Sequence, residues 1–176
     1  MVSRIASSSA ALPIAHAGLR ITIVLNWVFG AAIVALLVVM PNERWIMTTF
    51  KLSPSAEADR LILGLRAIAI TILASVPLYY VVLKRLLAIV ETVRAGDPFV
   101  AANARRLQAI AWALLALQIL GLVIGATAKA LSSPAHPIRL DSGVSIGGWL
   151  AVLLIFVLAR VFAEATCMRE DLEGTV

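Results

Sequence analysis

The sequence predicts an all-α integral membrane protein: a single four-helix bundle with up-down-up-down topology and a helical cytoplasmic hairpin between its second and third helices. Hydrophobic residues make up 61% of the 176 residues and charged residues 14%, and the mean hydropathy is +0.98. A soluble globular domain holds far fewer apolar residues. Four apolar segments each approach the roughly 20 residues that a helix needs to cross a bilayer. They cover about residues 21–40, 61–83, 107–128 and 145–163.

The first segment is predicted to be a retained span, not a cleaved signal peptide. Residues 15–17, Ala-His-Ala, resemble a small-residue cleavage site, but they precede the apolar run instead of following it. Residues 1–18 are small and polar and show no helical period. We therefore expect a flexible tail that becomes helical near Leu19.

The second segment contains one charge, Arg66, and one proline, Pro77. An arginine within a span is by default a candidate functional residue, here for a substrate, an ion or a lipid headgroup. Because only about one and a half turns separate it from Arg60, its long side chain can instead snorkel to the outer interface. Pro77 removes a backbone donor and predicts a kink.

The third segment carries a face of small residues that includes a Gly-x-x-x-Gly pattern, Gly121 and Gly125. Small residues let helix backbones approach closely in lipid. The face favours either homo-oligomerisation through this span or close packing inside one bundle. Under both alternatives, Gln118 on the same face would add a hydrogen bond between helices.

The basic residues indicate how the chain is oriented in the membrane. The formal net charge is +5, and most basic side chains flank the spans. The segment between spans two and three holds five of them, Lys84, Arg85, Arg94, Arg105 and Arg106. The positive-inside rule then places this hairpin and both termini in the cytoplasm of a multi-pass plasma (inner) membrane protein. No clustered basic face with base-contacting residues is evident, so we expect membrane lipid as a partner but no direct nucleic-acid contact.

Residues for common membrane chemistries are missing from the sequence. A metal or haem site needs convergent ligands, whereas the candidates His16, His136 and Cys167 are scattered. A thiol oxidoreductase needs paired cysteines, and proton-coupled export needs an acid within the spans. We therefore expect no enzyme, no catalytic residues, no cofactor and no metal. A small transporter or lipid-interacting protein that uses Arg66 and the Gln118 face stays as an alternative.

The segment over residues 84–106 is predicted to form a sharp helical hairpin. Its apolar residues have helical spacing through residue 93, so helix two should continue about three turns beyond the membrane. Gly96 suits the left-handed position that ends a helix. Asp97 suits an N-cap and Pro98 the first position of the next helix.

Two short patterns lie in this hairpin and in the C-terminal tail. The first is formed by Gly96, Pro98, Phe99, Asn103 and Leu107. The second is formed by Phe162, Arg169, Glu170, Thr175 and Val176. Both resemble a bacterial membrane-protein family catalogued as domain of unknown function 2975. The tail departs from that family at Ala165 and Met168, where its members more often have Gly and Leu.

The resemblance implies a four-span protein of a kind often encoded beside a small helix-turn-helix regulator. Our leading hypothesis is a non-enzymatic regulatory or scaffolding protein that binds such a cytoplasmic protein through the hairpin and the tail. The candidate docking or hairpin-motif residues are Glu91, Arg94, Gly96, Asp97, Pro98, Phe99, Asn103, Arg105, Arg106, Arg169 and Glu170. In the alternative, Phe99 packs between the ends of helices two and three and Asn103 bonds loop or tail backbone, so the motif only fixes the turn.

Overall fold

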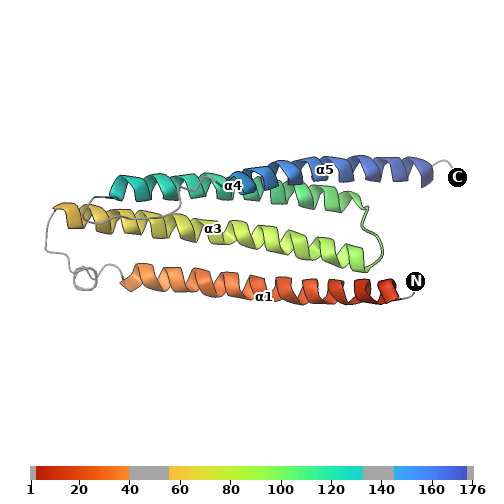
Figure 1. The fold of residues 1–176 in the computed structure, drawn as a ribbon, viewed down its shortest axis with the longest axis horizontal. Coiled ribbons are helices and arrows are strands. Elements are labelled where there is room, and N and C mark those ends of the chain that lie inside the picture. The colour runs from red at the N-terminus through yellow and green to blue at the C-terminus, as the bar shows by residue number, and fades with distance from the viewer. Residues whose placement is uncertain (1–2, 40–55, 133–144, 174–176) are drawn as a thin grey trace.

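Four long α-helices make up nearly all of the described chain. A computed structural model describes residues 3–39, 56–132 and 145–173. The helices are α1 (Ser3–Val39), α3 (Ala56–Arg94), α4 (Ala101–Leu131) and α5 (Ile146–Glu173). All four are long and apolar enough to cross a membrane. They run up-down-up-down, so the predicted fold class is confirmed and the chain is a multi-pass membrane protein (Figure 1).

Both termini lie at the same end of the molecule as the turn between α3 and α4 (Figure 1). This end is termed the hairpin end, and the opposite end, where α1 ends and α3 begins, the loop end. Helices α3 and α4 are the inner pair: α1 packs on α3, α3 on α4, and α4 on α5. The bundle is therefore a row of helices in chain order.

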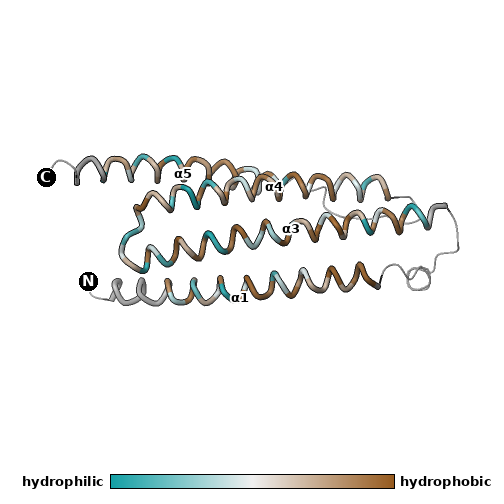
Figure 2. Tube along the Cα trace, turned by 180° about the vertical axis from the view of Figure 1, so that it is seen from behind, coloured by the Kyte–Doolittle hydropathy of each residue, from teal (hydrophilic) through white to brown (hydrophobic). Residues whose placement is uncertain are grey.

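The flanking helices expose most of their apolar surface. Only 6% of the most apolar window of α1 is buried, against 22% in α3 and in α4. Large apolar side chains such as Val28 on α1 and Leu154 on α5 are exposed, and Figure 2 shows hydrophobic residues in every helix. Such surface is stable only in lipid, because water would make its exposure costly.

Helix α1 begins much earlier than expected, at Ser3, and includes Pro13. The predicted flexible tail over residues 1–18 was therefore wrong for residues 3–18. A physical reason lies in helix cooperativity. Once the apolar run is helical, each further residue gains a hydrogen bond without a new nucleation cost, and the alanines of this segment favour the helix.

Helices α1 and α3 meet around Val76. The Asn26 side-chain amide donates to the Val76 carbonyl at 3.1 Å, and buried Gly30 lies against the Val76 side chain. One turn away, the Trp27 and Tyr80 rings lie 5.4 Å apart. The polar Asn26 thus stabilises helix packing, and α3 stays helical through the neighbouring Pro77.

The inner core joins three helices in the half of the bundle nearer the hairpin end. Val82, Ile110 and Ala113 are buried there, and Leu86, Ile89, Leu114 and Ile155 pack against them. Leu86 and Ile89 lie beyond the predicted span of residues 61–83. The predicted extension of helix two is confirmed, since α3 runs to Arg94, and its apolar face packs on α4.

The small-residue face of α4 packs inside the chain over part of its length. Gly125 and Ala128 are buried, and Gly121 is half-buried. On the facing helix α3, Gly64 is buried against the side chain of Leu131. This agrees with the packing alternative, while homo-oligomerisation stays a prediction.

Candidate functional site

The turn of the hairpin ends α3 in a Schellman motif. Gly96 has a φ of 85°, which confirms its predicted left-handed conformation. The Asp97 N–H donates to the Thr92 carbonyl and the Gly96 N–H to the Val93 carbonyl, both at 3.1 Å. These two bonds satisfy carbonyls that the end of a helix would otherwise leave unpaired.

Helix α4 starts later than the sequence predicted. Its first residue is Ala101 and its N-cap is Val100, which makes no side-chain capping bond. The expected N-cap role of Asp97 and first helical position of Pro98 were therefore wrong. Asp97 instead pairs with Arg169. Residues 97–100 are left non-helical, so that the Pro98 carbonyl can accept a hydrogen bond from the side chain of Asn103.

Asn103 is fully buried and every polar atom of its side chain is paired. Its amide nitrogen donates to Thr92 Oγ1 at 2.7 Å and to the Pro98 carbonyl at 2.8 Å. Its carbonyl oxygen accepts from the Arg106 guanidinium at 2.7 Å. Arg106 also donates to the Ala88 carbonyl of α3 at 3.1 Å. A buried, satisfied network of this kind holds the end of α3, the turn and the start of α4 in one geometry.

The C-terminal helix meets the hairpin through two contacts. Arg169 Nη1 lies 2.6 Å from Asp97 Oδ1, and the rings of Phe99 and Phe162 lie 5.5 Å apart. These four residues are termed the tail clasp. It joins residues of the two sequence patterns, Asp97 and Arg169 being 72 positions apart. Phe99 therefore packs on α5, whereas the sequence alternative placed it between the ends of helices two and three.

The remaining candidate residues divide between outward and inward positions. Glu91, Arg94 and Arg105 are exposed, and Phe99 keeps 46% of its surface exposed. The side chain of Asn103, in contrast, is buried inside the bundle. The side chain of Glu170 and residues 174–176 lie outside the described residues.

The contact between His16 of α1 and Glu91 of α3 could not be predicted from the sequence. His16 Nε2 lies 3.6 Å from Glu91 Oε1, which brings α1 to the hairpin end. Neither residue belongs to a pattern, and only the packing of α1 on α3 makes them neighbours. In the described part of the chain, no three His, Cys, Asp or Glu side chains are grouped to hold a metal ion.

Arg66 and Gln118 do not share a site. Gln118 Nε2 donates to the Ser145 carbonyl at 3.4 Å, so it faces the start of α5. Arg66 lies two positions after Gly64, which contacts Leu131 at the far end of α4. With a rise of 1.5 Å per residue, Arg66 and Gln118 are about 15 Å apart along the bundle.

We expect the ion pair of the tail clasp to contribute modestly to stability. Both side chains are about half exposed, at 48% and 45%, so Asp97→Lys or Arg169→Glu should lower the free energy of unfolding by about 0.5–1 kcal/mol. The double variant, with the charges exchanged, should recover most of that loss. Denaturation of the four proteins in detergent measures the coupling. Strictly additive losses would contradict a direct pair.

Comparison with known proteins gives one match. Residues 12–176 match the family described as Protein of unknown function (DUF2975). The matched range includes the whole hairpin and both residues of the Asp97–Arg169 pair. No curated protein and no solved structure matches the chain.

Proposed function

From the premise that the chain belongs to the family described as Protein of unknown function (DUF2975), we propose that it is a non-enzymatic membrane protein that docks a cytoplasmic protein at its hairpin end. Its role would be regulatory or scaffolding. The partner that the family resemblance favours is a small helix-turn-helix regulator. In this proposal the chain lies in the plasma (inner) membrane with both termini in the cytoplasm, as its basic hairpin favours.

The tail clasp is the observation that carries the proposal. It fixes two distant parts of the chain, the turn and the end of α5, into one continuous surface. The surface presents the half-exposed Phe99 at the same end as exposed Arg94. Aromatic and arginine side chains dominate binding energy at protein interfaces. A surface that is already fixed also loses less entropy on binding.

The charges at the hairpin end favour an acidic partner surface. Of the two acids of the hairpin, Asp97 pairs with Arg169 and Glu91 lies 3.6 Å from His16, against five basic residues in the same segment. Among the described residues, no ion pair or hydrogen bond occupies the side chain of Arg85 or Arg94. The net positive charge that remains would steer an acidic segment of the partner and select against basic ones.

A matched pair of charge reversals on α3 tests this proposal. Arg94 and Arg60 are both exposed, the first at the hairpin end and the second at the loop end. Proteins would be crosslinked in native membranes, purified with the chain and identified by mass spectrometry. We expect Arg94→Glu and Phe99→Ala to reduce recovery of a cytoplasmic partner by about tenfold, the loss of one interface hot spot, while Arg60→Glu leaves recovery unchanged.

Two results would count against docking at the hairpin end. One is recovery of no cytoplasmic protein by the unaltered chain. The other is equal recovery by Arg94→Glu, Phe99→Ala and Arg60→Glu. The alternative of a small transporter through Arg66 and the Gln118 face has less support, because about three helical turns separate these two side chains along the bundle.

A further inference from the structure

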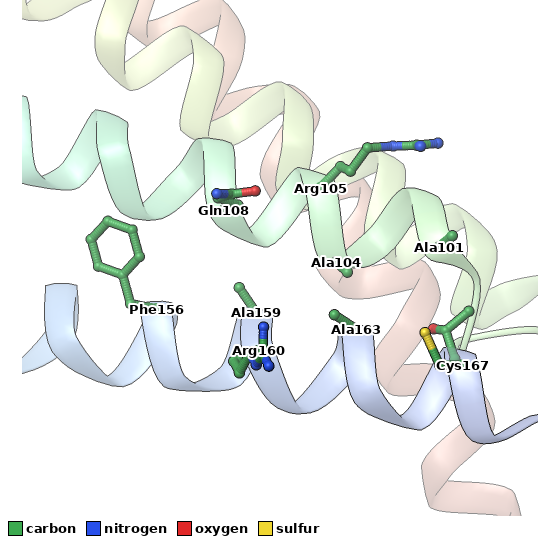
Figure 3. A pocket seen from close by; sticks show the side chains of 10 residues that line it. Ala101, Ala104, Arg105, Gln108, Phe156, Ala159, Arg160, Ala163 and Cys167 are labelled. Atoms are coloured by element: carbon green, nitrogen blue, oxygen red, sulfur yellow. The ribbon is translucent and has the colours of Figure 1, made fainter.

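A groove lies between α4 and α5 in the half of the bundle nearer the hairpin end (Figure 3). Its volume is about 420 Å³, within the range of about 300–1,000 Å³ that is usual for small-molecule sites. This α4–α5 groove is lined by Ala101, Ala104, Arg105, Gln108, Phe156, Ala159, Arg160, Ala163, Thr166 and Cys167.

The groove exists because alanines face one another across the two helices. Ala104 of α4 lies opposite Ala163 of α5, and Ala159 lies one turn further along, opposite Gln108 (Figure 3). The short alanine side chains leave the space between the helices unfilled. Toward the membrane interior, Phe156 closes the groove by packing edge-on against Trp112, with the ring centroids 5.3 Å apart. The inner part of the groove is therefore apolar.

The outer part of the groove is basic. Arg105 of α4 and Arg160 of α5 are among its lining residues, which include no acid. In Figure 3 the Arg105 side chain extends away from α5, so its guanidinium would have to turn to reach a ligand that Arg160 also binds. In the described part of the chain no side chain pairs with Arg105. The one ion pair of Arg160 within the described residues is with Glu164 of its own helix, at 3.7 Å and with both side chains more than half exposed, which is a weak interaction. Each of the two helices thus contributes one guanidinium to the lining of the groove.

The two arginines lie near the ends of the apolar runs of α4 and α5 that face the hairpin end. Arg105 lies two residues before the apolar run of α4, which begins at Leu107, and Arg160 lies in the last turn of the apolar run of α5. Glu164, which pairs with Arg160, is one turn nearer the hairpin end, so the guanidinium of Arg160 points toward the hairpin end. The groove is thus basic toward the hairpin end and apolar toward the middle of the bundle, as a lipid at the edge of a membrane would require.

We propose that the α4–α5 groove binds one anionic phospholipid of the leaflet at the hairpin end. The phosphate accepts hydrogen bonds from Arg105 and Arg160, and the Gln108 amide donates to a headgroup or ester oxygen. An acyl chain lies over the alanines as far as Phe156. Basic pockets between transmembrane helices commonly bind anionic headgroups in this way. The inference concerns lipid alone and does not depend on a protein partner.

The chain carries its own reporter for this site, since Cys167 lines the groove and is the only cysteine. The full chain would be placed in nanodiscs of phosphatidylcholine, with or without about one third phosphatidylglycerol, and the rate of Cys167 alkylation by an uncharged maleimide measured. Phosphatidylglycerol should slow alkylation about tenfold, consistent with two arginine contacts to one headgroup. Arg105→Gln with Arg160→Gln should abolish the slowing.

A matched double variant controls for overall charge. Arg85→Gln with Arg94→Gln removes the same charge from exposed positions outside the groove, and should keep the protection by phosphatidylglycerol. Protection that survives in the Arg105 and Arg160 double variant, or that is lost equally in the control, would overturn the site. Equal alkylation rates with and without phosphatidylglycerol, or equal protection by inorganic phosphate added to phosphatidylcholine nanodiscs, would overturn the assignment to an anionic lipid.

Discussion

Replacing Asn103 by leucine is expected to lower the free energy of unfolding by about 3 kcal/mol. Leucine has a similar shape, so the loss comes from hydrogen bonds and not from a cavity. The change removes the amide donor from Thr92 Oγ1 and from the Pro98 carbonyl, and one acceptor from Arg106. Thr92 Oγ1 keeps its own bond to the Ile89 carbonyl. Since Asn103 is fully buried, water cannot replace the missing amide, and the full cost of burying those polar groups remains.

Gln108→Leu is the control for Asn103→Leu. It makes the same kind of change on the same helix, at an exposed position, and should alter stability by less than about 0.5 kcal/mol. Thermal or chemical denaturation in detergent measures both variants. An Asn103→Leu variant as stable as Gln108→Leu would show that the buried network does not hold the turn. Asn103 would then regain its place among the candidate docking residues.

Replacing Gly30 by leucine is expected to destabilise the packing of α1 on α3, by about 2 kcal/mol. A Cβ atom at Gly30 would lie about 3.0 Å from Val76 Cγ1, and a leucine would extend further. Val76 is buried and, being β-branched in a helix, has essentially one allowed rotamer. The helices must therefore separate, which also strains the bond from Asn26 to the Val76 carbonyl.

Gly18→Leu provides the matched control for the α1 prediction. Gly18 is exposed on the same helix, and a Cβ there would meet nothing within 4 Å. This variant shares the gain in helix propensity without the steric conflict. Adding Val76→Ala to Gly30→Leu should recover part of the lost stability. Equal unfolding curves for Gly30→Leu and Gly18→Leu would contradict close packing at Val76.

Features that depend on neighbouring residues could be predicted from the sequence. Predicting the four membrane-spanning helices required only the composition and length of the apolar runs. The end of α3 needed only the conformational freedom of Gly96 and the helical spacing of residues such as Leu86. The signals for the end of α3 lie within about two helical turns, and each apolar run is one continuous segment of about six turns. The same locality explains one error: residues 3–18 carry no strong signal, so continuation of the adjacent helix determined their structure.

Features that depend on distant residues could not be predicted. The prediction that Asp97 is an N-cap used only its neighbours in sequence. Its partner Arg169 is 72 positions away, and the sequence does not show that the two residues are in contact. The hairpin pattern indicated that Asn103 is an important residue. It did not indicate whether the Asn103 amide faces a partner protein or the interior of the bundle. The α4–α5 groove requires alanines from two helices in register, and a sequence alone gives no register between helices.

The arrangement of the helices in a row has a consequence for how force passes through the molecule. Three pairwise interfaces stand in series, instead of one core shared by all four helices, so loss of one need not open the others. A pull on the C-terminal residues acts on α5 and, through Arg169 and Asp97, directly on the turn. Helix α1 lies outside this mechanical path. Helix α1 can thus anchor one edge of the bundle, while α5 at the other edge can transmit a load to the hairpin.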